Sequence, residues 1–480
     1  MKTLKNKIIV ALTGVMLLST TSCEKFYDIN QDPDFILDAP LPQLLTSATV
    51  NIGFTAGSDL SRYTALLTQQ LSGMSTGATN QTQNYERYQI SGQDANNVWS
   101  SIYAGILNDL ELIISKSNNT NSPHYAGVAK LLKAYTYQIA VDTWGNIPYS
   151  ETQKLTNNLT PKYDSAESIY TALLALIDEA IVNLNASSST LSPGTNSTIY
   201  PSAYTTSKAN WIKFANTLKL RIYLHYSEKN PQFATEKMNA LIGSSGVSFF
   251  SSNTDNFQMS FLASAGAKNP IDQFETARPD YLAAHKTMVD MMNTKADPRR
   301  SAYFTAVSGN YIGTVSGGPN TPAAFSKIGT YLRGTAGEAP IRMLTFAEYN
   351  FIRAEAALRL GVTGDAQTFF QAGITASMQD AGVSAANIAT YLAANGTLTG
   401  TTDQKLKQII EEKFVASIGM VVEPWTDWRR TGYPAISLPS NAVVNYVPRS
   451  LYYPQSEIDF NPNCTQKSGL NVRIFWDTKQ

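Results

Sequence analysis

Residues 345–379 read TFAEYNFIRAEAALRLGVTGDAQTFFQAGITASMQ, and this stretch decides the fold class. In each half, apolar side chains recur three or four positions apart, which is the spacing of one helix face. The short turn Gly361-Val362-Thr363-Gly364 joins the halves. The stretch therefore predicts two adjacent helices of the tetratricopeptide kind. The apolar positions are Phe346, Tyr349, Ile352, Ala356, Ala366, Phe369, Phe370 and Ile374.

Helical spacing also recurs outside this stretch, although no clean 34-residue period is found. Between about 247 and 340 the composition changes and Gly, Ser, Asn and Phe dominate, with one helical pattern at 279–293. The sequence predicts a mostly α fold of tetratricopeptide-like helix pairs with an inserted irregular lobe, in a single domain over 41–480. The other helical patterns cover 41–71, 97–115, 125–143, 165–185, 208–228, 231–242 and 403–420, whereas 74–93 is predicted to be a polar loop.

The N-terminus has the layout of a secretory signal. Lys2, Lys5 and Lys7 precede an apolar run of 11 residues, 8–18, which is too short for a bilayer that needs about 20. Small and hydroxyl residues then lead to Cys23. The segment resembles a bacterial lipoprotein signal, cleaved before a cysteine that is then acylated. We expect a signal peptide at 1–22, a lipid (palmitate) on Cys23 and a tether over 23–40; the alternative is an ordinary cleaved signal.

Composition excludes several classes of protein. The chain has 37 basic and 37 acidic residues, and without the three signal lysines 34 basic residues face 37 acidic ones. A protein that binds nucleic acid usually has an excess of basic residues, and this chain has none. The two cysteines, Cys23 and Cys464, exclude a disulfide scaffold and a zinc site built on cysteine pairs. Histidines 124, 225 and 285 are far apart in sequence, so no metal or other cofactor is expected.

Several motifs occur in order along the chain: FYDINQDP at 26–33, DTWGNIPY at 142–149, DPR at 297–299, EPWTDWRRTGYP at 423–434, Arg449, and YPQSE at 453–457. Taken together, they resemble the motifs of the SusD/RagB family of outer-membrane nutrient-binding lipoproteins.

The resemblance implies a binding protein rather than an enzyme. It implies four tetratricopeptide-like units, an irregular ligand-binding lobe and an outward-facing position, lipid-anchored in the outer membrane. The implied partner is a SusC-like TonB-dependent barrel, to which the protein delivers an oligosaccharide or a peptide. The family motifs shape the fold and do not themselves form a ligand site.

Two tracts combine aromatic rings with polar side chains, the residue types that bind sugars through ring stacking and hydrogen bonds. For each ring the alternative role is packing within the lobe. The candidate ligand-binding residues are Asn84, Tyr85, Arg87 and Tyr88 in the first tract, and Phe261, Phe274, Arg278 and Tyr281 in the second.

Other functions were weighed against binding. GMSTG at 73–77 fits the nucleophile pattern around Ser75, but a helical segment is expected before it and a loop after it, the wrong context for a nucleophile elbow. A glycoside hydrolase would need two carboxylates, and the candidate pairs are Glu411 with Glu412 and Glu423 with Asp427. Arg429 and Arg430 beside the second pair explain it by ion pairing. A scaffold that binds only protein remains a third hypothesis.

Overall fold

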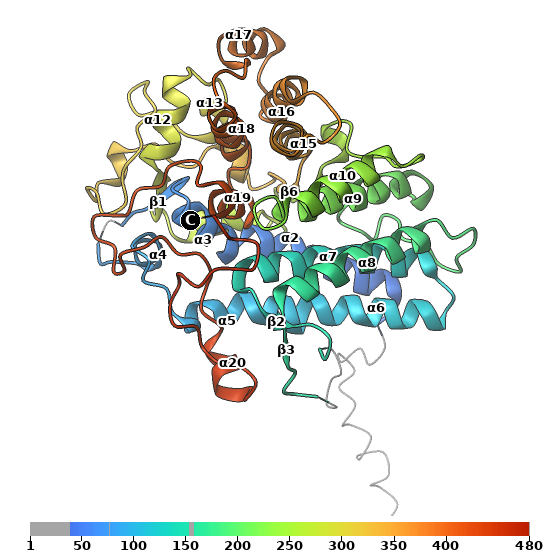
Figure 1. The fold of residues 1–480 in the computed structure, drawn as a ribbon. Helices are drawn as coiled ribbons and strands as arrows, with labels where there is room; N and C mark the ends of the chain where they lie inside the picture. Colours follow the sequence, from blue (N-terminus) through green and yellow to red (C-terminus); the bar gives the residue numbers. More distant parts are fainter. Residues whose placement is uncertain (1–38, 76, 153–157, 480) are drawn as a thin grey trace, which may run out of the picture. The chain divides into compact units, whose positions relative to one another are not determined.

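The computed structural model describes residues 39–75, 77–152 and 158–479. Residues Leu41–Gln480 form one compact unit, and Met1–Pro40 are a separate unit. The expected signal peptide and Cys23 lie outside the described residues. The prediction of a mostly α fold is confirmed (Figure 1). Among the described residues, no helix combines the length and the apolar character needed to cross a membrane.

Long helices packed side by side form the first part of the unit, and Figure 1 shows α6, α7 and α8 as neighbours. Helix α8 begins where the Ser165 side chain accepts a hydrogen bond from the Ser168 amide, an N-cap. Helix α7 is buried along most of its length because helices cover it on several sides. The helices are α2 (Leu41–Gly57), α3 (Asp59–Leu67), α6 (Asn108–Asn119), α7 (Pro123–Trp144), α8 (Ala166–Leu184), α9 (Tyr204–His225) and α10 (Pro231–Gly243).

The helix pair predicted over 345–379 is present as α15 (Phe346–Leu360) and α16 (Ala366–Asp380). Gly361, at φ +62°, ends α15 in the left-handed conformation, and the Asp365 side chain caps α16 by accepting from the Thr368 amide. Their facing apolar side chains form one buried cluster with α17 (Ala385–Asn395) and α18 (Thr402–Ala416). Helix α19 (Glu423–Thr431) follows.

A charged network is buried where α15, α18 and α19 meet. Arg430 donates to both carboxylate oxygens of Glu355, at 2.6 and 2.8 Å, and to Asp427 at 2.9 Å. Lys413 lies 3.0 Å from Glu423 and 2.8 Å from Asp427. Burial alone would raise the pKa of Glu355, but Arg430, helped by Arg359, outweighs it and lowers that pKa to about 2. The charged residues of the EPWTDWRRTGYP motif therefore hold helices together.

Residues 247–340 contain short elements joined by irregular segments. The helix predicted over 279–293 begins only at Lys286, because residues 282–284 form a strand instead. The elements are η4 (Asn253–Asp255), β4 (Phe257–Met259), α11 (Pro270–Ala277), β5 (Leu282–Ala284), α12 (Lys286–Thr294), α13 (Arg300–Tyr303), η5 (Pro322–Ala324) and α14 (Thr330–Arg333); β6 (Ile341–Leu344) follows and pairs with β4.

Strand β1 (Leu71–Gly73) pairs antiparallel with β5 and so joins the irregular segment to the end of α3. The prediction of a loop over 74–93 is wrong in part. Residues Gln81–Glu86 form the short helix α4, which the Asn80 side chain caps by accepting from the amides of Thr82 and Gln83. A helix of one to two turns has no room for an apolar repeat, so periodicity could not reveal it.

Helix α3 is hydrogen-bonded to residues that follow it by more than 340 positions. The Ser61 hydroxyl donates to the Gly419 carbonyl at 2.9 Å, and the Thr64 hydroxyl accepts from the Val422 amide at 3.1 Å. The Gln70 side chain donates to the Phe414 carbonyl at 3.0 Å. The N-terminal and C-terminal helices therefore share one core.

The helical pattern predicted over 97–115 is longer and less regular in the structure. It begins as α5 (Gly92–Ser100), widens into the π-helix η2 (Ser101–Leu107) and continues as α6. Residues after 431 form mostly coil, with the short helix α20 (Gln455–Phe460). Farther toward the N-terminus, strand β2 (Ile147–Pro148) pairs with strand β3 (Tyr163–Asp164).

Candidate functional site

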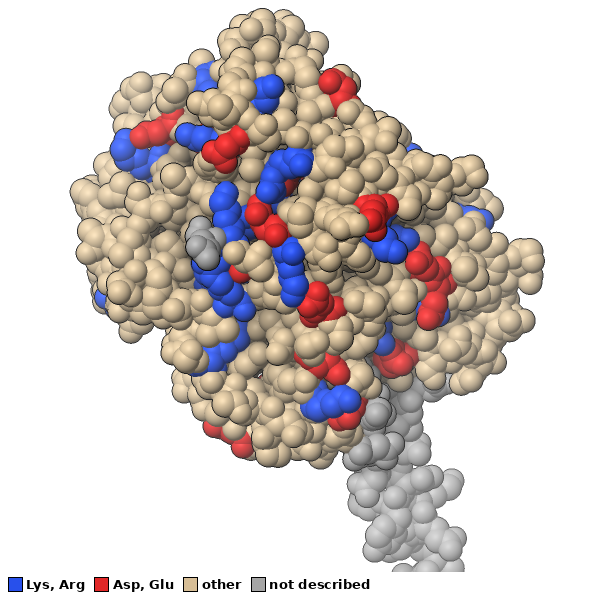
Figure 2. Space-filling view, in the orientation of Figure 1, with Lys and Arg blue, Asp and Glu red and all other residues tan. Residues whose placement is uncertain are grey.

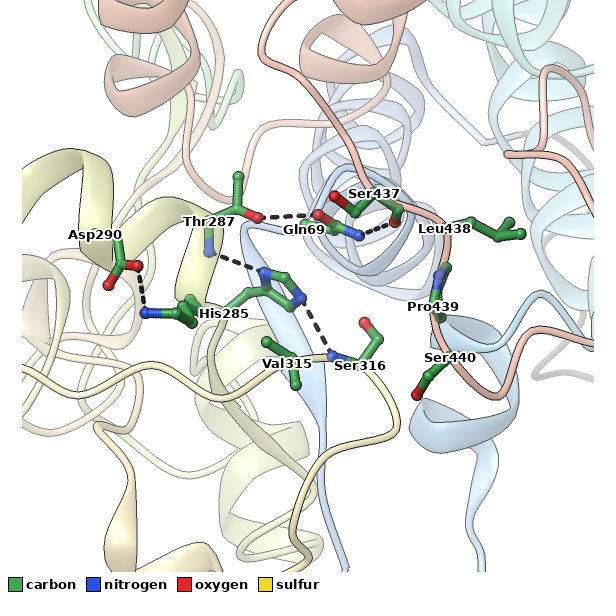
Figure 3. Close-up of a pocket in the computed structure, with 11 residues that line it drawn as sticks. Gln69, His285, Thr287, Asp290, Val315, Ser316, Ser437, Leu438, Pro439 and Ser440 are labelled. Atoms are coloured by element: carbon green, nitrogen blue, oxygen red, sulfur yellow. Dashed lines mark hydrogen bonds and ion pairs between the residues drawn. The ribbon is translucent and has the colours of Figure 1, made fainter.

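Four segments from distant parts of the sequence surround a depression of about 400 Å³, called here the Gln69 depression. They are Gln69, two residues after the end of α3, the start of α12 from His285 to Asp290, the loop at Val315 and Ser316, and residues 437–440 (Figure 3). None of the eight candidate residues from the sequence lines it.

Gln69 ties three of these segments together. Its side-chain amide donates to the Ser437 carbonyl at 2.6 Å and accepts from the Thr287 hydroxyl at 2.9 Å, as Figure 3 shows. Its backbone is left-handed, at φ +61°. This conformation is uncommon outside glycine and is often found at functional sites. Gln69 is thus a fixed polar group between two walls.

His285 fixes the start of α12. Its Nδ1 accepts from the Thr287 amide at 3.1 Å, and its Nε2 faces the Ser316 amide at 3.3 Å. Because both ring nitrogens face N–H donors, protonation of the ring is opposed. Burial, the main cause, lowers the pKa of His285 to about 4, although Asp290 acts in the opposite direction.

We expect acid to destabilise the fold through His285. The unfolded chain binds a proton near pH 6.5 and the folded chain only near pH 4, so stability falls as the pH drops through this window, by up to about 3 kcal/mol. The measurement is urea unfolding of the wild type and of His285→Asn, which keeps a neutral capping acceptor, at pH 7, 5.5 and 4. The wild type should lose more stability than the variant. Equal losses would contradict this role of His285.

The walls of the Gln69 depression are polar but carry little net charge. Gln69, Thr287, Ser316, Ser437 and Ser440 supply amide and hydroxyl groups, and the two charged lining residues, Lys286 and Asp290, pair with each other. Val315 and Leu438 add apolar surface and are 45% and 46% exposed. On the face in Figure 2, too, uncharged surface predominates, and cationic side chains lie beside anionic ones. Such walls suit a neutral ligand with both hydroxyl groups and C–H surface.

The first candidate tract lines a second depression of about 320 Å³, called here the Tyr88 depression. Asn84, Tyr85 and Tyr88 lie on one side of it, and Val443 and Val444 on the other. The Tyr88 hydroxyl and the Asn84 Oδ1 are buried and lack a hydrogen-bond partner among the described residues. Buried polar groups without partners are uncommon, so these atoms are candidates for contact with a ligand.

Residues 437–444 connect the two depressions, because their first half lines one and their second half the other. The Val443 amide donates to the Arg87 carbonyl at 2.9 Å, so Arg87 positions this segment through its backbone. Gly317 lies so close to Asn441 that a Cβ there would approach its side chain to 2.6 Å. The segment is therefore held from two sides.

The second candidate tract lies at neither depression. The Phe274 ring is buried between the guanidinium groups of Arg62, 4.1 Å from its centroid, and Arg278, at 5.3 Å, and Tyr281 meets its edge. Phe261 is buried apart from them. The two tracts do meet, because the Tyr281 carbonyl accepts from the Thr82 hydroxyl at 2.7 Å. This packing favours the structural alternative for Phe274 and Phe261.

The candidate catalytic groups lie in unsuitable places. The Ser75 hydroxyl donates to the Ala78 carbonyl, and although β1 precedes it, no helix opens on it. Glu412, Glu423 and Asp427 are buried and ion-paired, Glu412 with Arg299 and Lys295. A polysaccharide could not reach these three carboxylates, whereas Glu411 is half-buried and lies 3.7 Å from Lys407. Within the described ranges, no group of three or more His, Cys, Asp or Glu side chains could hold a metal.

Sequence reasoning missed the residues of the Gln69 depression because no motif joins them. Positions 69 and 437 are separated by most of the chain and meet only through the fold. One signal was present: Leu438 and Val315 are apolar residues within stretches of Ser, Gly and Pro, where no helix or strand pattern would bury them.

Together, these features define a class of helical protein with polar surface depressions of the size of a small ligand. A family model described as "Starch-binding associating with outer membrane" matches residues 36–454, and the chain belongs to this SusD-like family. The resemblance found in the sequence is confirmed.

Solved structures share the fold. A chitin-binding protein superimposes with a TM-score of 0.79 at 24% identity, covering 92% of this chain and 100% of that one. A chitin-binding SusD homolog from Flavobacterium johnsoniae gives 0.75 at 24% identity, covering 92% and 97%. A SusD homolog from Bacteroides uniformis gives 0.76 at 22% identity, covering 91% and 99%. No curated protein matches the chain.

Proposed function

We propose that this protein captures a neutral oligosaccharide in the Gln69 depression and delivers it to a TonB-dependent barrel in the outer membrane. A lipid on Cys23 would hold it there, facing the exterior. The observation that carries the proposal is the hydroxyl-rich wall of this depression, whose two charged residues pair with each other, in a chain whose family is described as starch-binding and associated with the outer membrane. Two solved structures of the same fold are titled chitin-binding.

A neutral sugar fits this wall better than a peptide does. Sugar hydroxyls both donate and accept, as do the hydroxyl groups of Thr287, Ser437 and Ser440 and the amide of Gln69. The C–H faces of a sugar ring can cover Leu438 and Val315. A charged peptide would need an unpaired charge, whereas Lys286 and Asp290 satisfy each other.

Release matters as much as capture in this role. A few hydrogen bonds and about two apolar contacts are consistent with a micromolar dissociation constant, about −8 kcal/mol. No bond is made or broken, and the ligand leaves unchanged. Delivery would be disproved if the full chain, purified from outer membranes, carried no barrel with it.

We expect Leu438→Ala to weaken binding of the oligosaccharide about five- to tenfold, because it removes about 1 kcal/mol of apolar contact. The soluble part of the chain, 24–480, would be titrated with chitohexaose, maltohexaose and a peptide library by isothermal calorimetry. Leu191→Ala is the matched control, because Leu191 is 45% exposed and Leu438 46%, and Leu191 does not line the depression.

The outcomes separate the alternatives. Weaker binding in Leu438→Ala alone supports the site. Binding to peptides but to no sugar would overturn the ligand class. New reducing ends from an incubated polysaccharide would instead support a glycoside hydrolase, and protein partners without any small ligand would support a scaffold.

A further inference from the structure

A third depression, the largest of those described here at about 520 Å³, shares no lining residue with the other two. It is called here the Trp99 depression. Its walls come from α5 and the π-helix η2, from β2, from residues 158–161 and from α20. Figure 1 shows α5, β2, β3 and α20 close together, and α5 contacts α20. Two of its lining residues, Pro148 and Glu457, belong to the motifs at 142–149 and 453–457, which were expected to shape the fold and not to form a ligand site.

Aromatic rings form one side of this depression. The rings of Trp99 and Tyr103 lie 4.4 Å apart between centroids at an angle of 31°, and Tyr163 lies nearly parallel to Trp99, at 17° and 6.4 Å. Both residues line the cavity, but Trp99 is only 5% exposed whereas Tyr103 is half-buried, so Tyr103 offers the ring surface and Trp99 packs against it. Flat aromatic surface beside a cavity is the kind of surface on which the C–H face of a sugar ring packs.

The π-helix explains how these side chains reach the cavity. A π-turn is wider than an α-turn, is rare, and is frequently found at functional sites. Here it spans Ser101–Leu107 and carries Tyr103 and Ala104 into the wall. The Tyr103 hydroxyl donates to the Pro148 carbonyl at 2.8 Å, which fixes its ring. Ala104 is exposed and leaves the cavity open.

Polar groups face the same space. Tyr163 and Asn461 donate to one oxygen of the Glu457 carboxylate, Oε2, at 2.9 and 3.2 Å. The other oxygen, Oε1, receives no hydrogen bond from the described residues and can accept one from a sugar hydroxyl. Asn108 and Asn158 line the cavity as well and offer amide groups.

The surroundings are unusually apolar for a surface. Leu159, on the rim, is 77% exposed, and Phe460 on α20 is 80% exposed. The segments that carry them are joined, because Asn461 and Asn463 donate to the carbonyls of Pro161 and Thr160 at 3.0 and 2.8 Å. Leu159 therefore offers exposed apolar surface to a ligand at the rim of the cavity.

We propose that the Trp99 depression is a second carbohydrate-binding site, in which a sugar ring packs on Tyr103 and a hydroxyl donates to Glu457. The choice of carbohydrate as ligand rests on the proposed function, but the site itself is independent of the Gln69 depression. A polysaccharide chain held at two places dissociates more slowly than one held at a single place.

Ala104→Trp tests the site by filling it. Ala104 is exposed, so the fold should tolerate the change, which circular dichroism would check. Ser101→Trp is the matched control, because Ser101 is exposed on the same π-helix but does not line the cavity. Calorimetric titration of the 24–480 chain with chitohexaose and maltohexaose should give two sites per chain for the wild type and for Ser101→Trp, and one for Ala104→Trp.

The two proposals can fail separately. One site per chain in the wild type, unaffected by Ala104→Trp but weakened by Leu438→Ala, would overturn the second site and leave the proposed function intact. Two sites that lose one in Ala104→Trp, with no effect of Leu438→Ala, would keep the second site and overturn the Gln69 depression. No binding to either sugar would overturn both.

Discussion

Replacing Arg430 with methionine should lower the free energy of unfolding by about 3–5 kcal/mol, the cost of leaving buried charges without their partner. Arg430 is fully buried and donates to Glu355, Asp427 and the Ser227 hydroxyl. Without it, among the residues that the structure describes, Glu355 keeps only Arg359, at 3.0 Å, and the carboxylate of Asp427 keeps only Lys413. Methionine fills a similar volume, so the loss reports mainly on the charges.

Urea unfolding at pH 7, followed by circular dichroism, measures this change. Arg473→Met is the control: its side chain is 40% exposed and pairs with Asp477 at 3.1 Å, so it should cost less than about 1 kcal/mol. A double variant, Arg430→Met with Glu355→Leu, should recover part of the loss, since it removes the uncompensated charge. A loss below 1 kcal/mol in Arg430→Met would mean that water or a shifted helix α19 compensates the carboxylates.

Trp476→Ala should destabilise the fold by about 3–5 kcal/mol, the usual range for a fully buried aromatic residue. Trp476 comes from the C-terminal coil, yet it is completely buried. Its indole N–H donates to buried Asp142 at 2.9 Å, and its ring lies 4.8 Å from the Arg429 guanidinium. The variant loses the packing of the indole ring, and the Asp142 carboxylate loses the hydrogen bond from the indole N–H.

Phe460→Ala is the control for Trp476→Ala, because Phe460 belongs to the same C-terminal region but is 80% exposed. It should change stability by less than about 0.5 kcal/mol. Trp476→Phe should lie between them, since it keeps an aromatic ring but loses the donor. Equal thermal midpoints for Trp476→Ala and the wild type would show that the C-terminal coil does not stabilise the core.

The regular helices could be predicted from the sequence because burial on one face imposes a period of about 3.6. The pattern at 165–185 corresponds to α8, Ala166–Leu184, and the pattern at 345–360 to α15. Where a tertiary contact determines the secondary structure, the apolar spacing in the sequence was not enough to predict it. The strand at Leu282–Ala284 exists because β1 pairs with it, and the π-turns at Ser101–Leu107 have no period that a sequence scan would recognise.

The candidate site was less predictable than the fold. Aromatic tracts identified Asn84, Tyr85 and Tyr88, which do line a depression, although their binding role stays a prediction. The same criterion selected Phe274, whose ring is enclosed by two arginines. Composition cannot distinguish a ring that faces a ligand from one that packs inside. Gln69 and Ser437 have ordinary local sequences, and only the fold brings them together.

The hydrogen bonds between α3 and residues 414–422 bear on how the chain acquires its structure. Ser61, Thr64 and Gln70 find their partners only after more than 340 further residues have been synthesised. Contacts so distant along the chain slow folding, because a long loop must close before they form. Ser61, Thr64 and Gln70 therefore complete these hydrogen bonds only after the residues around 420 have been made.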